Sequence, residues 1–435
     1  MFGASPGKIT HSPASSTNAD PLPGLARGTD QFANQKVVVQ RLRRLRNSGY
    51  RLSRWSLLQH GETRRFGMRK LMLAVAVVMA CGLLSGPALL QERGGEDETG
   101  PYEVVPNWPQ QLARPGYALG SQGGVFAESP NRIILVNRGE IKLPDNLPNN
   151  FTGAYGSIGS SLTPTPEMRN CIIIVDATGK MIESWTQWDH LFEGGRGPHK
   201  VKISPYDPQR HVWVIDDLRQ QVFKFSHDGK QLVMTLGEAG VAGNDEKHFG
   251  RPTDIAWLPD GTFFISDGYT NTRVVKFDRN GKFLMTWGTP GTGPGQFNTV
   301  HSIDIDRNRR LYVADRGNMR IQIFDENGKY LDQFGGLRQP QHVMVTADGH
   351  LGIVGGNNNK VTKFDLKGKL ITSWGTQGTF PGGLWNMHQF SVDSEGNLYI
   401  AEATGGRTQK FRPRPGADRS RLIGPPQPLM ALGTN

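Results

Sequence analysis

The chain has 435 residues, of which 36% are hydrophobic, with 55 glycines and 28 prolines. This composition excludes a disordered chain and favours a turn-rich globular protein. A net charge of +11 suggests a nucleic-acid partner, but residues 1–70 hold 13 Lys and Arg against 3 Asp and Glu. The remaining residues hold 37 against 36, and this neutral body argues against nucleic-acid binding.

An uncharged stretch of 20 residues, 71–90, follows the basic tail and is long enough to span a bilayer. One interpretation is an uncleaved membrane anchor. The other, which we favour, is an export signal with its true start codon at Met68, so that residues 1–67 are mis-assigned. Both interpretations predict an extracytoplasmic location, periplasmic, secreted or membrane-anchored, for the rest of the chain.

The sequence therefore divides into four expected parts. They are a basic tail (1–67), a signal peptide or single transmembrane anchor (68–92), a repeat domain (105–415) and a C-terminal tail (416–435). Only two cysteines are present, and Cys81 lies in the apolar segment. Cys171 is then the single thiol of the exported part, which we expect to lack an internal disulfide.

A turn that ends in Gly-Lys recurs along the repeat domain, as in "FDRNGK" and "FDENGK", with its lysines at 180, 230, 282, 329 and 369. Strand-like runs surround each turn, such as "DIAWLPDGTFFISD" before it and "FLMTWG" after it. Four strands in 40–50 residues are typical of a propeller blade. Inner strands begin near residues 120, 200, 254, 302, 342 and 389. The segments resemble NHL repeats, and we predict an all-β, six-bladed β-propeller.

Histidine recurs at one position of alternate blades. The second residue at the start of the inner strand, in blades two to six, is His199, Thr253, His301, Gln341 and His388. Inner strands line the channel of a propeller, so the three histidines converge on its axis. Three imidazoles with a fourth position open are typical of a catalytic zinc site. The alternative is that each histidine is a channel residue bonded to water; His342 is one residue out of phase.

The ends of the second strands carry a further set of candidates. Acidic residues there predict turn caps: Asp216, Asp267, Asp315 and Glu402. Arg138, Tyr269 and Arg316 depart from this pattern on the face that bears the histidines. A tyrosine beside a metal and arginines can have its pKa lowered and act as a base. Arginine can bind a carboxylate through two parallel hydrogen bonds. Alternatively, either arginine forms a surface ion pair, or Arg273 or Arg320 binds the carboxylate in its place.

Several stretches together resemble the peptidyl-α-hydroxyglycine α-amidating lyases: "GRPTDIAW", "ISDGYTNTRVVKF", "GPGQFNTVHSIDID" and "LYVADRGNMRIQIF", within a similarity that covers residues 105–413. The resemblance implies a six-bladed propeller with a central Zn²⁺ that cleaves a C-terminal α-hydroxyglycine to a peptide amide and glyoxylate. It implies that His199, His301 and His388 bind the zinc. It also implies that Tyr269 is the base and that Arg138 and Arg316 hold the substrate carboxylate and the developing charge.

Two departures from that family affect the expectations. Gln389 follows the third histidine where the family has an aspartate that helps to hold Ca²⁺, which argues against calcium here. Residues 1–100 are too short for a copper monooxygenase domain that would make the hydroxyglycine. We expect a peptide or small-molecule substrate with a terminal carboxylate, which is either another α-hydroxy-amide, such as a ureidoglycolate-like compound, or the product of a separate enzyme. The alternatives are a non-catalytic propeller that binds a protein or glycan, and a lactonase-like hydrolase, although the six strand starts lack its calcium ligands.

Overall fold

The structure, a computed structural model, describes residues 98–147, 149, 151 and 165–433. The predicted basic tail and apolar segment lie outside these residues. Within the described part of the chain, no helix is long and apolar enough to cross a membrane.

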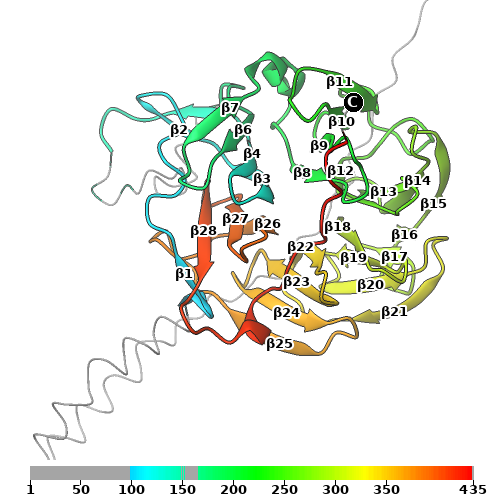
Figure 1. Cartoon of the computed structure of the whole chain (residues 1–435). Helices are drawn as coiled ribbons and strands as arrows, with labels where there is room; N and C mark the ends of the chain where they lie inside the picture. Colours follow the sequence, from blue (N-terminus) through cyan, green and yellow to red (C-terminus); the bar gives the residue numbers. More distant parts are fainter. Residues whose placement is uncertain (1–97, 148, 150, 152–164, 434–435) are drawn as a thin grey trace, which may run out of the picture. The chain divides into compact units, whose positions relative to one another are not determined.

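Six antiparallel sheets of four strands each are arranged around a central axis (Figure 1). The strands of each blade follow one another from the inside outwards. Blade one consists of β3 (Gln122–Ser129), β4 (Arg132–Asn137), β6 (Ile172–Val175) and β7 (Met181–Ser184), and blade two of β8 (Lys200–Ile203), β9 (Val212–Asp216), β10 (Gln221–Phe225) and β11 (Leu232–Leu236). Blade three consists of β12 (Pro252–Trp257), β13 (Phe263–Asp267), β14 (Arg273–Phe277) and β15 (Phe283–Trp287). Blade four consists of β18 (Val300–Ile305), β19 (Leu311–Asp315), β20 (Arg320–Phe324) and β21 (Tyr330–Phe334). Blade five consists of β22 (Pro340–Val345), β23 (His350–Gly355), β24 (Val361–Asp365) and β25 (Leu370–Trp374). The predicted six-bladed propeller is confirmed.

Blade six closes the ring with a strand from the other end of the domain. Its first three strands are β26 (Met387–Val392), β27 (Leu398–Glu402) and β28 (Arg407–Pro413), and its outermost strand is β1 (Tyr102–Val104). Neighbouring inner strands contact one another in the closed order β3, β8, β12, β18, β22, β26 and back to β3. The repeat spacing did not reveal this closure, because a three-residue strand outside the repeats carries little pattern.

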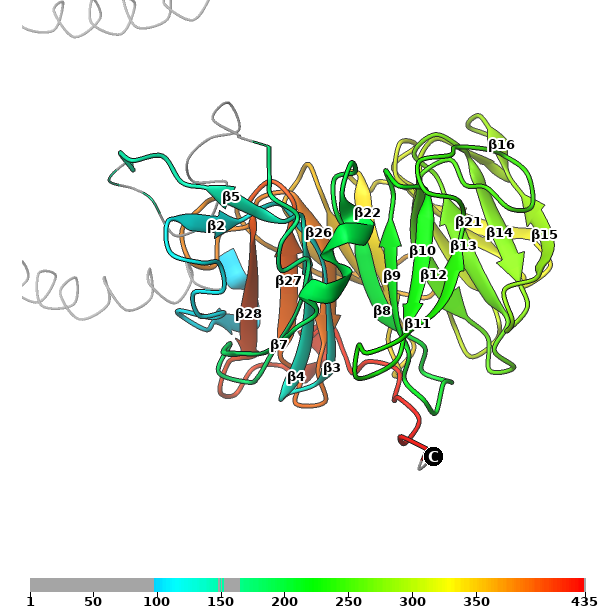
Figure 2. The ribbon, with the colours of Figure 1, turned by 90° about the horizontal axis from the view of Figure 1, so that it is seen from above.

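Small elements decorate the blades. Two short pairs are β2 (Tyr117–Leu119) with β5 (Glu140–Lys142), antiparallel, and β16 (Thr289–Pro290) with β17 (Gln296–Phe297), parallel. The described residues also form two 3₁₀ helices, η3 (Thr186–Phe192) and η4 (Arg419–Arg421). The pair β2–β5 lies at the top of the propeller in Figure 2, whereas the C-terminal segment lies at the bottom.

The repeated Gly-Lys turns join the third and fourth strands of a blade. In the turn at 278–282, one carboxylate oxygen of Asp278 accepts the backbone N–H of Asn280 at 2.8 Å and of Lys282 at 2.9 Å. Gly281 has a φ of +82°, in the left-handed region that glycine enters without steric cost. The same arrangement at Asp325 and Asp365 explains why the motif repeats.

Each pair of neighbouring blades buries its own apolar core. Between blades two and three, the ring of Trp213 packs at 5.1 Å from that of Phe263 and at 5.9 Å from that of Trp257. The second strands β9, β13, β19 and β27 are buried along their whole length, whereas the outer strand β15 alternates between half-buried and exposed residues. Six such interfaces hold the inner strands rigidly around the axis.

The last residues form a C-terminal strap, residues 414–433, which crosses the mouth of the channel (Figure 1, red). Its Ile423 is fully buried and donates its backbone N–H to the Tyr102 hydroxyl at 2.9 Å. Further along, the carbonyl of Pro425 accepts the N–H of Ala347, and the N–H of Met430 donates to the Pro205 carbonyl at 3.0 Å. The strap thus ties blades five and six to blade two.

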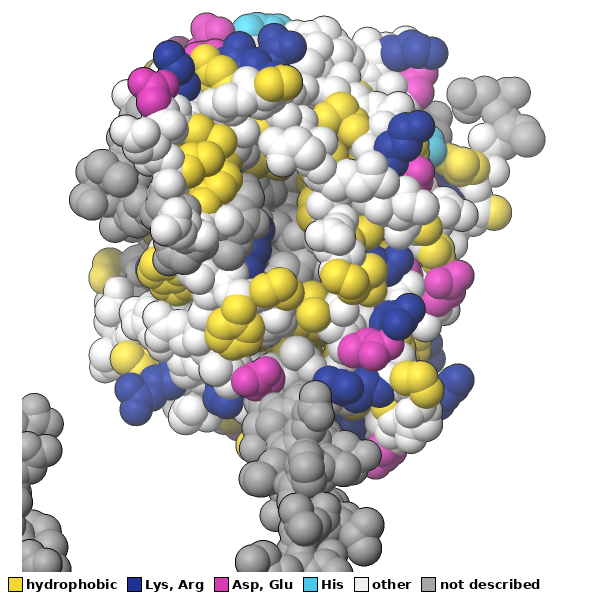
Figure 3. Space-filling model, turned by 90° about the vertical axis from the view of Figure 1, so that its left-hand side faces the viewer, with side chains coloured by type: hydrophobic (Ala, Val, Ile, Leu, Met, Phe, Trp, Pro, Cys, Tyr) yellow, Lys and Arg dark blue, Asp and Glu magenta, His cyan; other side chains and the backbone are white. Residues whose placement is uncertain are grey.

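On the side of the molecule in Figure 3, basic, acidic and apolar side chains are interspersed. Neither sign of charge forms a continuous field on this face, in agreement with the neutral composition of the repeat domain.

Candidate functional site

Three buried histidines meet on the axis of the propeller. His199, His301 and His388 each offer one ring nitrogen, and these nitrogens lie within 4.8 Å of one another. The side chains are 0%, 0% and 4% exposed. The geometry fits a metal ion with three imidazole ligands.

A repeated β-bulge directs this position towards the channel. The pairing between inner and second strand skips one residue in five blades, and the skipped residues are Gly123, Thr253, His301, Gln341 and His388. In blade two, His199 precedes β8 and donates its backbone N–H to the Ile215 carbonyl at 2.6 Å. A bulged residue leaves the ladder and re-aims its side chain, which is why the same position faces the axis in every blade.

The backbone of the next blade fixes each imidazole. The Nδ1–H groups of His199, His301 and His388 donate to the carbonyls of Thr253, Gln341 and Gly123 at 2.9, 2.7 and 2.6 Å. A carbonyl only accepts, so Nδ1 of each neutral ring carries the proton and Nε2 keeps the lone pair that can bind a metal. Burial, reinforced by the charge of Lys200, holds the pKa of all three histidines well below the usual value.

Tyr269 reaches the histidines from the loop that follows β13. Gly268, directly before it, lies so close to blade four that a Cβ there would meet the Val300 carbonyl oxygen at 1.8 Å. The Tyr269 hydroxyl lies 2.8 Å from Nε2 of His301 and 3.3 Å from Nε2 of His199. The structure therefore brings the tyrosine to two of the three histidines.

The lowering of the tyrosine pKa that we expect beside a metal stays a prediction, because the protein groups alone act in the other direction. Burial raises the pKa of Tyr269 above its usual value, and Arg316, Arg138 and Arg251 only partly oppose this effect. The reason is that loss of water around the phenol outweighs the attraction of the arginines.

Arg316 and Arg138 both line the cavity beside Tyr269, where the sequence pattern placed them. The Nη1 of Arg316 lies 3.4 Å from the Tyr269 hydroxyl and 3.4 Å from the side-chain oxygen of Gln341. Arg138 approaches Asp217 at 3.7 Å. Both arginines are half-buried, so each can meet a substrate while it remains held by the protein.

Arg251 belongs to the same group, although the sequence did not single it out. Its guanidinium carbon lies 4.4 Å from the centre of the Tyr269 ring, and its Nε donates to Asp217 at 3.1 Å. Asp217 thereby anchors both Arg138 and Arg251. The sequence contained one sign of this arrangement, the second aspartate of "VIDD", because only the first aspartate is needed as a turn cap.

The alternative arginines are structural. Arg273 and Arg320 are buried and pair with Asp267 and Asp315 at 2.9 and 2.8 Å. Those carboxylates also accept backbone N–H groups from the loop that leads into the inner strand, at Gly250 and Asn298.

Of the predicted turn caps, Asp216 caps the following turn at Leu218 and Arg219. Asp267 and Asp315 accept side-chain N–H groups of Asn271 and Asn318 in the following turn, while their backbone donors lie in the preceding loop. Glu402 accepts the backbone N–H of Trp385, also in the preceding loop.

The near chamber is a cavity of about 290 Å³ above the histidines. Among the described residues its lining contains no acidic side chain, and its charged members are Arg138, Arg196 and Arg316. Gln341, Asn357 and Asn386 add amide groups. Gln341 occupies the blade-five position that matches the histidines, whereas Asn357 and Asn386 could not be predicted because single amides carry no motif. The lining suits an anionic, hydrogen-bonding ligand.

One residue further along the inner strands lies a polar layer that separates the near chamber from the rest of the channel. It consists of Gly124, Lys200, Asp254, Ser302, His342 and Gln389. The Lys200 ammonium is fully buried and donates to the carbonyls of His301 and Gln341 at 2.9 and 3.0 Å. Burial lowers the pKa of Lys200 to about 8, while Asp254, 3.3 Å away, favours its charge.

Gln389, at the position where calcium was considered, binds the backbone instead. Its Nε2 donates to the Val201 carbonyl at 2.8 Å, and its Oε1 accepts the Val201 N–H at 3.3 Å. This contact requires Gly124, because a Cβ there would lie 2.0 Å from the Gln389 oxygen. Both ends of the amide are thus occupied by protein.

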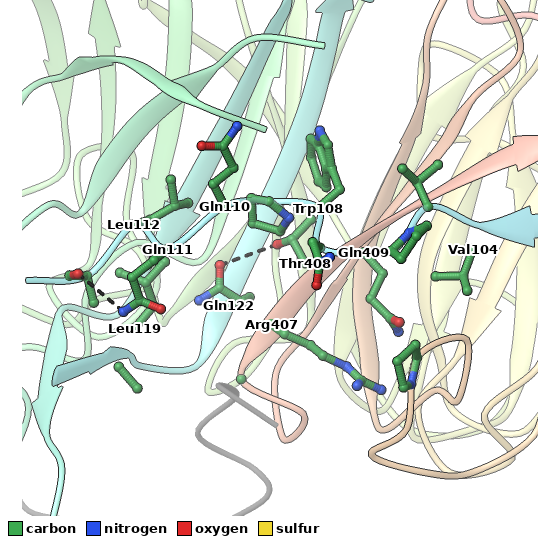
Figure 4. Close-up of a pocket in the computed structure, with 18 residues that line it drawn as sticks. Val104, Trp108, Gln110, Gln111, Leu112, Leu119, Gln122, Arg407, Thr408 and Gln409 are labelled. Carbon is green, nitrogen blue, oxygen red and sulfur yellow. Dashed lines mark hydrogen bonds between the residues drawn. The ribbon is translucent and has the colours of Figure 1, made fainter. Parts of the chain in front are cut away.

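A larger cavity, of about 530 Å³, lies away from this chemistry (Figure 4). It is formed where the segment 104–113 passes Gln122 and the start of β28. Two of its polar side chains are already engaged with the protein: Arg407 pairs with Glu402 at 3.0 Å, and Gln122 accepts from Thr408 at 3.3 Å. The three converging histidines do not line this cavity. We therefore place the functional site at the histidines.

Comparison with known proteins agrees with the fold. A family model described as a 6-bladed beta-propeller matches residues 242–333. Peptidyl-glycine alpha-amidating monooxygenase B of Xenopus laevis is 30% identical over 352 residues, which cover 77% of this chain and 38% of that protein. Peptidyl-alpha-hydroxyglycine alpha-amidating lyase 1 of Drosophila melanogaster is 32% identical over 269 residues, 54% of this chain and 47% of the fly protein. The chain is a relative of the peptidyl-α-hydroxyglycine α-amidating lyases.

The resemblance seen in the sequence is thereby confirmed. A further relative, the probable peptidyl-alpha-hydroxyglycine alpha-amidating lyase pgal-1 of Caenorhabditis elegans, is 28% identical over 232 residues, 49% of this chain and 63% of that protein. This chain spans less than two fifths of the Xenopus protein and less than two thirds of either lyase.

Proposed function

We propose that this protein is an exported, zinc-dependent lyase that cleaves the C–N bond of an α-hydroxyglycine-type amide. The observation that carries the proposal is the convergence of three neutral imidazoles with the Tyr269 hydroxyl, 2.8 Å from Nε2 of His301. Its lyase relatives support the reaction class. The products are the primary amide and glyoxylate when the substrate is a peptidyl-α-hydroxyglycine.

The three histidines would hold the ion through Nε2, since each Nδ1 is committed to a backbone carbonyl. When bound, zinc supplies a Lewis acid that polarises the carbinol oxygen and adds positive charge beside the Tyr269 phenol. That added charge is needed, because burial raises the pKa of Tyr269 in the metal-free chain. Neutral, buried imidazoles favour a borderline-soft cation over the oxygen-seeking Ca²⁺.

The side chains of the near chamber then divide the remaining work. Arg316 and Arg138 bind the substrate carboxylate, and Arg316 lies close enough to Tyr269 to set its hydroxyl beside the carbinol. Tyr269 removes the hydroxyl proton, the carbinol carbon becomes the aldehyde carbon, and the electrons of the C–N bond pass to nitrogen. The nitrogen takes up one proton and leaves as the amide, so atoms and charge balance.

The substrate's reacting end is a small, anionic group. A chamber of about 290 Å³ lined by arginines and amides accommodates a glycolate unit and little more of the acyl portion. The acyl portion is therefore either a peptide that extends from the chamber into solvent, or a small group such as the urea of a ureidoglycolate-like molecule. The exported location rests on the apolar segment at 71–90.

The test is glyoxylate release from synthetic N-acyl-α-hydroxyglycines by the purified chain, with zinc supplied and with zinc chelated. We expect zinc-dependent release that is lost in Tyr269→Phe and retained in the surface control Tyr330→Phe, a partly buried tyrosine in the outer strand β21. Release that survives Tyr269→Phe, or that does not depend on metal, would overturn the proposal. Metal binding without any turnover would retain the site and reject the substrate.

A further inference from the structure

The half of the channel beyond the polar layer holds a second cavity, the far chamber, of about 330 Å³. All six blades contribute to its wall, and the C-terminal strap covers it with Pro426, Gln427, Pro428 and Leu429. Asp304 in its wall lies three residues beyond His301 along β18, about 10 Å at the rise of a strand. The far chamber is therefore separate from the metal ligands.

Its walls are mainly apolar and aromatic, with Phe126, Tyr206, Trp257, Met344, Phe390 and Leu429 among them. A volume near 300 Å³ is at the small end of the range for ligand cavities, and such cavities combine apolar walls with a few polar groups. The far chamber has this character, so the polar groups decide which ligand it suits.

Most charges in the far chamber are already paired. Glu128 binds Arg210 at 2.9 Å. Lys202 binds Asp254 at 3.0 Å and donates to the carbonyls of Ile255 and Ile303 at 3.0 and 3.1 Å, which uses all three of its protons. These groups have little left to offer a ligand.

Asp304 is the exception. Its two carboxylate oxygens accept the backbone N–H groups of Ile305 at 3.0 Å and Val345 at 2.7 Å. Within the described part of the chain, no cationic side chain lies within ion-pair distance of it. Each oxygen keeps a lone pair for a further donor, and the side chain retains accessible surface inside the chamber.

We propose that the far chamber is a second ligand site, which binds a small organic ammonium ion with an apolar body. The ammonium pairs with the Asp304 carboxylate, which is the only unpaired charge among the described residues that line the chamber. The aromatic rings of Tyr206 and Trp257 surround the apolar body and favour a cation near their faces. An anionic ligand would meet an uncompensated carboxylate and is disfavoured.

The site is connected to the metal centre through the polar layer. His342 lines the far chamber, and its Nδ1 lies 3.1 Å from the Ser302 hydroxyl and 3.5 Å from the Lys200 ammonium. That ammonium in turn donates to the Gln341 carbonyl, which accepts from His301. Ligand binding in the far chamber does not require the lyase reaction, so the two proposals can fail independently.

The experiment is isothermal titration calorimetry on the full chain with three probes of equal size: benzylammonium, benzyl alcohol and benzoate. We expect benzylammonium to bind at least tenfold more tightly than either of the others. Asp304→Asn preserves shape and one acceptor oxygen, and it should reduce benzylammonium binding to the level of the alcohol. Asp260→Asn, an exposed aspartate between β12 and β13, is the matched control and should bind as the unchanged protein does.

Three results would overturn the proposal. They are equal binding of benzylammonium and benzyl alcohol, unchanged binding in Asp304→Asn, and binding that is lost in Tyr269→Phe but not in Asp304→Asn, which would place the ligand in the near chamber. If Asp304→Asn does not fold, the relative affinities of the three probes for the unchanged protein still show whether the site prefers an ammonium ion.

Discussion

The two chambers of the channel are built by the same six strands but have opposite chemistry. The near chamber is lined by three arginines and by amides, with the three converging histidines at its base. The far chamber is mostly apolar, is covered by the C-terminal strap and has one unpaired carboxylate. In five of the six blades, a bulge at the start of the inner strand exposes polar positions on one side, whereas the regular pleat beyond it presents larger apolar residues. Reaction and apolar binding are thus expected in different halves of one axis.

His301→Ala should have the largest effect, because it removes one of three ligands and leaves a gap at the axis. We expect the variant to lose its bound zinc. Removal of a residue that only hydrogen-bonds to a metal ligand typically lowers activity by roughly 10- to 100-fold, and glyoxylate release should fall by more than this when a ligand itself is removed. Elemental analysis of the purified variant and an activity assay measure this. The exposed His190→Ala provides a control and should keep both metal and activity.

Tyr269→Phe separates chemistry from metal binding. It removes the hydroxyl while the ring still packs beneath Arg251. We expect glyoxylate release to fall by about 10²–10⁴-fold, the usual contribution of a general base, with metal content unchanged. A variant that loses zinc together with activity would show that the hydroxyl acts as a metal ligand.

Lys200→Met tests the layer between the chambers. The substitution leaves Asp254 and two buried carbonyls short of a donor, and breaking a buried ion pair costs about 3–5 kcal/mol. Urea unfolding should show this loss, whereas Lys282→Met on an exposed turn should leave the free energy of unfolding almost unchanged. An equally stable Lys200→Met variant would contradict the role of the layer.

Ile423→Ala weakens the strap without touching the near chamber. Removal of a fully buried isoleucine side chain costs about 2–5 kcal/mol, and the exposed Ile182→Ala should cost less than about 0.5 kcal/mol. We expect a lower unfolding temperature and unchanged glyoxylate release below it. Loss of activity in the folded variant would show that the two halves are not independent.

The pH dependence of the metal-free protein should show the smallest effect. Burial keeps the pKa of the three histidines well below 6.5 in the folded chain. As the pH falls below about 6.5, the unfolded chain takes up protons that the folded chain refuses, so the free energy of unfolding decreases. Glu402, whose pKa burial raises to about 6, acts with the opposite sign.

His388→Gln isolates the histidine contribution to that profile. It should reduce the slope below pH 6 by at most about 1.4 kcal/mol per pH unit, the value for one proton. Urea unfolding at pH 7, 6 and 5 for both proteins measures the difference. Identical slopes would contradict a buried, neutral His388.

Much of the fold could be predicted from the sequence, because local turn chemistry repeats with the blades. The Gly-Lys turns and the alternating strands of each repeat identified the six blades, and equivalent positions put His199, His301 and His388 on the axis. The closure by β1 and the path of the strap could not be predicted, since they depend on tertiary contacts such as that of Ile423 with Tyr102. Arg251 was missed for the same reason: its place over Tyr269 depends on a left-handed backbone turn with φ of +67°.

The metal content of the purified chain, measured beside that of His388→Gln after equal exposure to zinc, tests the central claim most directly. We expect near one zinc per unchanged chain and a clear loss in the variant, whose fold should persist because the six blade interfaces are untouched. An unchanged protein that holds no zinc, or a variant that holds as much as the unchanged protein, would contradict the assignment of the three histidines as a metal site.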